Sequence, residues 1–138
     1  MVFPAPGGAL IGKRVGAYRI ERQIAAGGMG VVFAATQEQP QRRVALKMMR
    51  LGLATAESRR RFRYEAETLA RLHHPGIAQV YEAGAYRSED LASGCELPFF
   101  AMEYVEGART LLEYARDSAL DLRARLELFR RVCAAVHH

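Results

Sequence analysis

Apolar and polar residues alternate along the first third of the chain, and this alternation predicts three β-strands. The strands cover residues 18–24, 31–35 and 43–49, which are rich in β-branched, aromatic and other apolar side chains. Residues 25–30 and 37–41 connect them with glycine, proline and polar residues. Strands joined by turns this short run in opposite directions, so the pattern predicts an antiparallel meander.

The spacing of apolar residues then becomes helical and afterwards returns to that of strands. Phe62, Ala66, Leu69 and Leu72 form one apolar stripe, which predicts a helix over residues 56–72. The pair Pro75-Gly76 ends this helix, because proline cannot continue it. A strand, a polar loop and a second strand are expected next, over residues 77–83, 86–96 and 97–104.

Two helices complete the predicted order. Residues 110–116 have the composition of a short helix, and residues 121–138 form a longer amphipathic helix that Asp121 is placed to cap. The complete order predicts an α+β fold. In this fold a five-stranded antiparallel sheet packs against one helix and is followed by two more helices.

Composition fits one globular domain, because half of the 138 residues (50%) are apolar. The net charge of +5 would suit a polyanionic partner. The one tight basic cluster, residues 59–63, is interpreted as a solvated helix face, so no nucleic-acid partner is expected. A surface that faces an acidic or phosphorylated segment remains an alternative.

Several classes of protein and site are disfavoured by the remaining composition. No run of about 18 apolar residues occurs, so no membrane segment is expected in this chain. Residues 1–11 are rich in proline and glycine and predict a flexible leader instead of a signal peptide. Cys95 and Cys133 lie far apart, and plain thiols fit a cytoplasmic location. The histidines form two adjacent pairs, which do not share a helix face, so no metal site is predicted.

A glycine-rich turn joins the first two predicted strands, and such turns can bring backbone N–H groups close to a phosphate. A dinucleotide-binding loop would lead into a helix, whereas a strand follows here. A Walker loop would end in Gly-Lys-Ser/Thr, which is absent. An ordinary hairpin turn and a phosphate-binding hairpin remain open for this segment, Ala25-Ala26-Gly27-Gly28-Met29-Gly30.

Lys47 stands near the end of the third apolar strand, in the sequence Val44-Ala45-Leu46-Lys47. A lysine in such a position is costly to desolvate unless it has partners, so we expect an anion on one side and a carboxylate on the other. The carboxylate candidates are Glu65 and Glu67 on the next helix. Glu65 borders the apolar stripe, whereas Glu67 lies about 200° further around the helix and should be solvated.

These segments together resemble the N-terminal portion of the catalytic domain of bacterial, Hanks-type serine/threonine protein kinases. The similar segments run in the family's order from about Gly12 to the end of the chain. They comprise the hairpin with Gly-Gly-Met-Gly, the Val-Ala-x-Lys strand, the helix around Glu65, His74-Pro75-x-Ile77, and residues 100–107, Phe-Ala-Met-Glu-Tyr-Val-Glu-Gly.

The resemblance implies a nucleotide-binding small lobe over residues 12–102, a hinge over residues 103–107 and the start of a large lobe over residues 108–138. It also implies that the chain is truncated before the catalytic loop. The complete kinase would transfer the γ-phosphate of ATP to serine or threonine hydroxyls of a protein substrate, with Mg²⁺ held outside this chain.

The resemblance also implies a role for each site residue. Lys47 would hold the α- and β-phosphates and pair with Glu65, and these two are the catalytic candidates. The glycine loop, residues 25–30, departs from the family at its first position, where Ala25 replaces glycine. The adenosine would lie among Ile24, Val32, Ala45 and the gatekeeper Met102, against the backbone of Glu103 and Val105, with Glu106 near the ribose.

The resemblance implies that the helix over residues 121–138 lacks the large-lobe helices that would surround it. Burying one large apolar side chain is worth about 1.5–3 kcal/mol, so its apolar stripe would need a partner. We expect this stripe to be largely exposed in a monomer, unless the helix folds back onto the small lobe. The stripe comprises Leu122, Leu126, Phe129, Val132, Cys133 and Val136.

Two functional hypotheses of different classes follow. One is part of an active kinase, and the alternative is a non-catalytic module that binds nucleotide or a partner kinase. The sequence contains neither His-Arg-Asp nor Asp-Phe-Gly, which carry the catalytic and metal-binding aspartates of the family. A nucleotide-dependent oxidoreductase is disfavoured, because a strand follows the glycine turn.

We therefore predict that the 138-residue chain alone has no phosphotransferase activity. Incubation with labelled ATP, Mg²⁺ and a generic protein substrate should give only background labelling, because both aspartates are absent. Labelling above background that Lys47→Met abolishes would refute this prediction.

Overall fold

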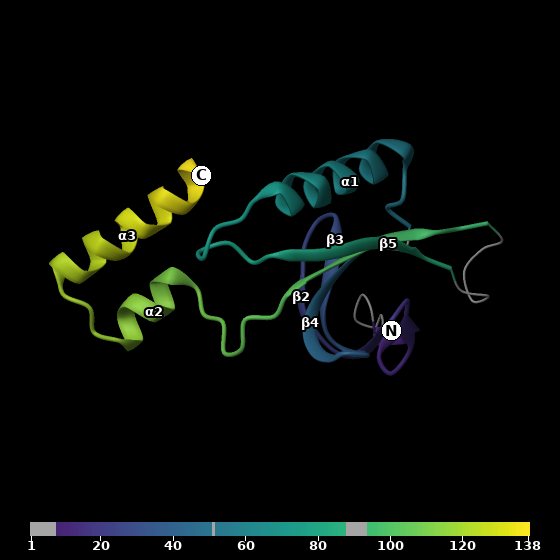
Figure 1. Ribbon diagram of the computed structural model, residues 1–138, viewed down its shortest axis with the longest axis horizontal. Coiled ribbons are helices and arrows are strands. Elements are labelled where there is room, and N and C mark those ends of the chain that lie inside the picture. Colours follow the sequence, from purple (N-terminus) through teal and green to yellow (C-terminus); the bar gives the residue numbers. More distant parts are fainter. Residues whose placement is uncertain (1–7, 51, 88–93) are drawn as a thin grey trace, which may run out of the picture.

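The computed structural model describes residues 8–50, 52–87 and 94–138 (Figure 1). One antiparallel sheet carries α1 on one side, and α2 and α3 follow beyond the last strand. The elements in chain order are a 3₁₀ turn at Gly8–Leu10, β1 (Arg14–Val15), β2 (Tyr18–Ala26), β3 (Gly30–Glu38), β4 (Gln41–Met49), α1 (Ala56–Arg71), β5 (Val80–Tyr86), β6 (Leu97–Glu103), α2 (Leu111–Asp117) and α3 (Leu122–His137).

The sheet confirms the predicted fold class and has one strand more than expected. Its six strands lie in the order β1-β2-β3-β4-β6-β5, and each neighbouring pair is antiparallel. The additional strand, β1, has two residues, which is too short to show a period in the sequence. It pairs with the start of β2 across a tight turn, in which Gly16 has a positive φ of 57°.

The β5 strand begins and ends three residues later than expected, at Val80–Tyr86 instead of residues 77–83. It continues to Tyr86, which pairs with Leu97 of β6, whereas the sequence placed its end at residue 83 and began a loop at 86. Its interior residues are exposed, so no alternation marks the strand in the sequence. The rest of the predicted loop includes residues 88–93, which lie outside the described residues.

Two apolar clusters hold the fold together. The larger one fills the curled sheet and includes Val15, Phe33 and Leu46. The smaller one joins α1 to β5 and β6, where the ring of Phe62 lies 5.3 Å from that of Phe100. The apolar stripe predicted for residues 56–72 is therefore the face of α1 that packs on the sheet.

The N-terminal turn is part of this packing. Leu10, in the 3₁₀ turn, is partly buried against the larger cluster. The flexible leader was expected over residues 1–11, of which residues 1–7 lie outside the described part of the chain.

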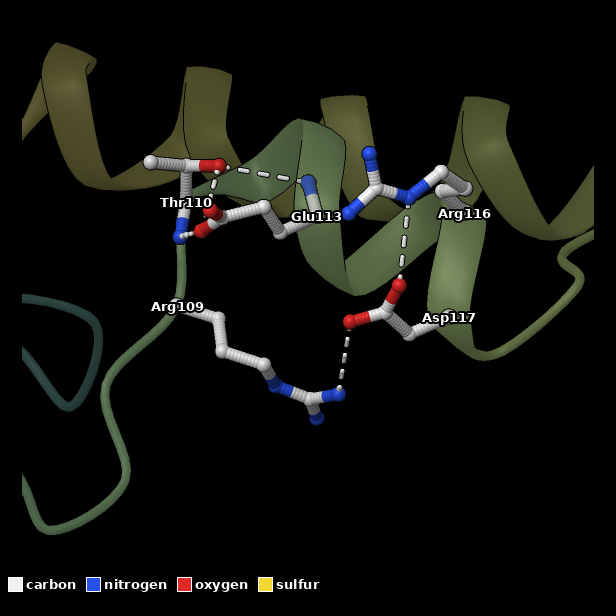
Figure 2. Close-up of polar contacts among 5 residues, drawn as sticks. All are labelled: Arg109, Thr110, Glu113, Arg116 and Asp117. Atoms are coloured by element: carbon white, nitrogen blue, oxygen red, sulfur yellow. Dashed lines mark hydrogen bonds and ion pairs between the residues drawn. The ribbon is translucent and has the colours of Figure 1, made fainter.

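The two C-terminal helices begin at capped ends, of which the sequence predicted the one at Asp121. The hydroxyl of Thr110 accepts from the N–H of Glu113, and the Glu113 carboxylate accepts in return from the N–H of Thr110 (Figure 2). Asp117, near the end of α2, lies 3.8 Å from Arg109 and 3.2 Å from Arg116. Asp121 caps α3 by accepting from the N–H of Ala124 at 2.8 Å.

The apolar stripe of α3 is largely exposed, as predicted. Leu122, Leu126, Phe129 and Val136 are 60–83% exposed, and none of the helix's residues is buried. Figure 1 shows α2 and α3 together at one end of the molecule, beyond the strand ends. No helix among the described residues is both long and apolar enough to cross a membrane.

Phe62→Ala should lower the free energy of unfolding by about 3–5 kcal/mol, because it removes a fully buried ring from the contact between α1 and the sheet. Tyr64→Ala is the matched control, since Tyr64 is 71% exposed on the same helix. Its effect should stay within about 0.5 kcal/mol. Chemical denaturation of both variants measures the difference, and equal losses would contradict the assigned packing.

Candidate functional site

Strand register places three predicted site residues and Phe100 in one row across the sheet. Ala25 pairs with Val32, Val32 with Lys47, and Lys47 with Phe100. Directly paired residues in a sheet present their side chains on the same face. Because Phe100 packs against α1, the row lies on the face of the sheet that carries this helix.

Ala45 and Met102 extend this face toward the end of β6. They are paired with each other, and Ala45 lies two residues from Lys47 on the same strand. Ala45 is buried and Met102 is half-buried against the smaller apolar cluster. The structure therefore brings the predicted adenine-contacting residues on β3, β4 and β6 together on one apolar face.

Lys47 and Glu65 are in direct contact, as predicted. The Nζ atom of Lys47 donates to the Glu65 carboxylate at 2.5 Å. The two side chains are 21% and 30% exposed, so the pair is partly shielded from water. The Lys47 ammonium group also lies 5.8 Å from the centroid of the Phe100 ring. A charge-assisted contact of this kind contributes about 1.5–3 kcal/mol.

Packing of α1 explains why Glu65, and not Glu67, reaches the lysine. Phe62 and Ala66 are the buried residues of α1, and Glu65 precedes Ala66 at the edge of this buried face. Glu67 is exposed, as expected from its position around the helix. The helix begins at Thr55, whose hydroxyl accepts from the N–H of Ser58 at 3.2 Å.

The glycine turn forms the tip of the hairpin between β2 and β3. The N–H of Gly27 donates to the Gly30 carbonyl at 2.9 Å, and a side chain at Gly28 would meet no atom within 4 Å. The following segment is a strand, which excludes the dinucleotide-binding loop. Ala25 needs no positive φ, since Ala119 is the one non-glycine residue in the described part of the chain with such a backbone. Its replacement of glycine therefore introduces no backbone strain.

Gly30 has a packing role that the sequence did not show. A Cβ atom at this position would lie 2.8 Å from the backbone carbonyl oxygen of Met48 on β4. Such a contact is closer than real Cβ atoms approach, so only glycine allows β3 and β4 to lie this close here.

The remaining loop and hinge positions are exposed around this row. Ile24 and Met29 are 40% and 38% exposed, and Ala26 is exposed. In the hinge, the N–H of Glu103 donates to the Gln79 carbonyl at 2.8 Å. Val105 is 56% exposed, and Glu106 lies 3.4 Å from Arg43.

Several hinge contacts were missed by the sequence analysis. Arg22 and Arg43 both contact Tyr104 in the hinge, although the three residues lie on separate segments. The only available signal was the pairing of β4 with β6. This pairing places Val44 opposite Glu103, the first residue of the hinge, and Arg43 directly precedes Val44.

The arginines of the basic cluster on α1 differ in their hydrogen-bonding partners. Arg59 donates to the carbonyls of Ala54 and Glu96, and Arg61 pairs with Glu57 at 2.5 Å. A hollow on the exposed side of the helix is separate from the row that contains Lys47. It is lined by Arg60, Arg63, Tyr64 and Glu67.

Comparison with known proteins identifies the family. The protein kinase domain model matches residues 18–138. The chain is 38% identical over 132 residues to the serine/threonine-protein kinase PrkC of Bacillus subtilis, and this covers 94% of the chain. It is 35% identical over 122 residues to the serine/threonine-protein kinase PknA of Mycobacterium tuberculosis, covering 88% of the chain. The chain belongs to the protein kinase family, and the predicted family is confirmed.

A solved structure agrees with this assignment. The kinase domain of Mycobacterium tuberculosis PknI superposes with a TM-score of 0.64 at 28% sequence identity, covering 90% of this chain and 48% of that one. The chain matches only part of each relative's length. The chain spans 19% of the length of PrkC and 28% of that of PknA.

Gly30→Ala should destabilise the chain by about 1–3 kcal/mol, because its Cβ would meet the Met48 carbonyl oxygen and push β3 away from β4. Gly28→Ala is the control, since open space surrounds that position, and its effect should stay within about 0.5 kcal/mol. Thermal and chemical unfolding measure both effects. A Gly30→Ala variant as stable as Gly28→Ala would contradict the close approach of the strands.

Proposed function

We propose that this chain is the ATP-binding part of a serine/threonine protein kinase that, when complete, transfers the γ-phosphate of ATP to protein hydroxyls. The observation that carries the proposal is the Lys47–Glu65 contact, placed directly beside the glycine hairpin by the pairing of Lys47 with Val32. A family relation alone gives the fold, whereas a lysine held by a carboxylate beside a glycine hairpin supports an anion site here.

Lys47 has donors left for an anion. An ammonium group carries three N–H donors, and Glu65 is its one hydrogen-bonding partner among the described residues. The Cε atom of Lys47 lies 3.6 Å from the position of a Cβ atom at Gly30, so the ammonium group is close to the end of the glycine hairpin. Lys47 would thereby hold the α- and β-phosphates without losing its carboxylate partner.

The hairpin and the apolar face fit the rest of the nucleotide. Open space around Gly28 would let the loop, Ala25 to Gly30, bring backbone N–H groups close to phosphate oxygens. Ile24, Val32 and Ala45 would enclose the adenine, with Met102 behind it. The backbone of Glu103 and Val105 would bind the adenine edge, and Glu106 would approach the ribose.

Magnesium is proposed for the complete kinase only. In the described part of the chain, no group of three or more His, Cys, Asp or Glu side chains is placed to hold a metal ion. We therefore assign no binding step to a metal here. The residues that position the nucleotide act by charge, hydrogen bonding and apolar contact.

The proposal also covers the boundaries of the kinase lobes in this chain and its cellular location. Residues 12–102 would be the small lobe, residues 103–107 the hinge and residues 108–138 the start of the large lobe, with a protein substrate bound by the complete kinase. Cys95 and Cys133 are free thiols, which supports a cytoplasmic location.

Isothermal titration of the chain with ATP tests the proposal, and saturable one-to-one binding is expected. Lys47→Met should weaken binding about 10-fold or more, because it removes the charged donor to the phosphates. Lys13→Met is the matched control, since Lys13 is the other lysine of the chain and lies outside the proposed site. Equal binding by both variants, or no binding by the unchanged chain, would refute the proposal.

A further inference from the structure

The hinge leaves the sheet at Glu103, and its position beyond that point depends on side chains. The last backbone pair between β4 and β6 joins Val44 to Glu103. Among the described residues, no strand pair includes residues 104–107. Ladder pairing therefore cannot hold the part of the hinge that contains Val105.

Two arginines contact this part of the hinge through their side chains. Arg22 on β2 donates to the Tyr104 hydroxyl oxygen at 2.8 Å. The Arg43 guanidinium lies 5.5 Å from the centroid of the Tyr104 ring and 3.4 Å from the Glu106 carboxylate. We call Arg22, Arg43, Tyr104 and Glu106 the hinge clamp.

Arg43 is itself held in place by the sheet. Its Nε atom lies 3.7 Å from the carboxylate of Glu21 on β2, and the Thr36 hydroxyl on β3 donates to the same carboxylate. The Arg43 side chain is half exposed, and Tyr104 is half-buried. Arg43 thus links β2 and β3 to both ends of the three-residue segment Tyr104-Val105-Glu106.

We propose that Arg43 is a positioning residue for the adenosine part of the nucleotide. By holding Tyr104 and Glu106, it fixes the backbone of Val105 between them, which would bind the adenine edge. The inference rests on the proposed function, since it concerns how that same site selects its ligand. Arg43 does not reach the phosphate-binding residues Lys47 and Gly28, so its effect is confined to the adenosine end.

Arg42 provides a matched control next to it in the sequence. Successive residues on a strand point to opposite faces. Arg42 lies 3.8 Å from the centroid of the Tyr81 ring on β5 and donates to Gln37. It has the same charge and the same exposed setting, but it does not contact the hinge.

The test compares ATP with tripolyphosphate, which has the phosphates and lacks the adenosine. Titration should show that Arg43→Ala raises the Kd for ATP about 3- to 10-fold, the range expected from one ion pair and one cation–π contact. The Kd for tripolyphosphate should stay within about 2-fold of the unchanged chain, as should both values for Arg42→Ala. A residue that only stabilised the fold would change the affinity for both ligands.

Tyr104→Ala provides a second, independent variant. It should reproduce the selective loss for ATP, and the double variant Arg43→Ala/Tyr104→Ala should lose less than the product of the two single effects, because both remove the same support. Unchanged ATP affinity in Arg43→Ala, or equal losses for ATP and tripolyphosphate, would overturn the inference and leave the proposed function standing. Binding of neither ligand by the unchanged chain would instead contradict the proposed function, and the inference with it.

Discussion

The contact between Lys47 and Glu65 is the constraint on which the rest of the site depends. It joins a strand in the middle of the sheet to the one helix that packs on it, and it is partly shielded from water. A lysine alone in this position would be costly to desolvate, and a carboxylate alone would be equally costly. Each side chain therefore stabilises the other, and the pair lies where the phosphates are proposed to bind.

The surrounding packing serves to bring these two charges together. Phe62 and Phe100 hold α1 against the sheet and so set the distance of Glu65 from β4. Gly30 allows β3 to approach β4 closely, which places the glycine hairpin beside Lys47. A helix that moved away from the sheet would separate the ion pair while leaving the hairpin in place. The site thus depends on tertiary packing as much as on the residues that would touch a nucleotide.

The sequence predicted those parts of the fold whose side chains repeat with a clear period. The stripe of α1 and the meander were predicted in this way. The cap of α3 was predicted from Asp121 as an N-cap residue, and the Lys47–Glu65 contact from the strand-end lysine, a carboxylate at the edge of the stripe and the family resemblance. The β1 strand was missed because two residues show no period. The end of β5 was missed because its inner residues are exposed and show no alternation. Gly84 in this strand leaves room for the ring of Phe99, because a Cβ atom at Gly84 would lie only 2.8 Å from that ring. The hinge clamp was missed because its residues meet through strand register and have no sequence motif of their own.

A double-mutant cycle on ATP affinity tests the central claim most directly. The variants are Lys47→Met, Glu65→Gln and the two combined, with titration of ATP into each. If Glu65 acts by orienting Lys47, each single change should weaken binding, and the double variant should bind no more weakly than Lys47→Met alone. Losses that multiply in the double variant, or a Glu65→Gln variant that binds ATP as well as the unchanged chain, would contradict a site built on this ion pair.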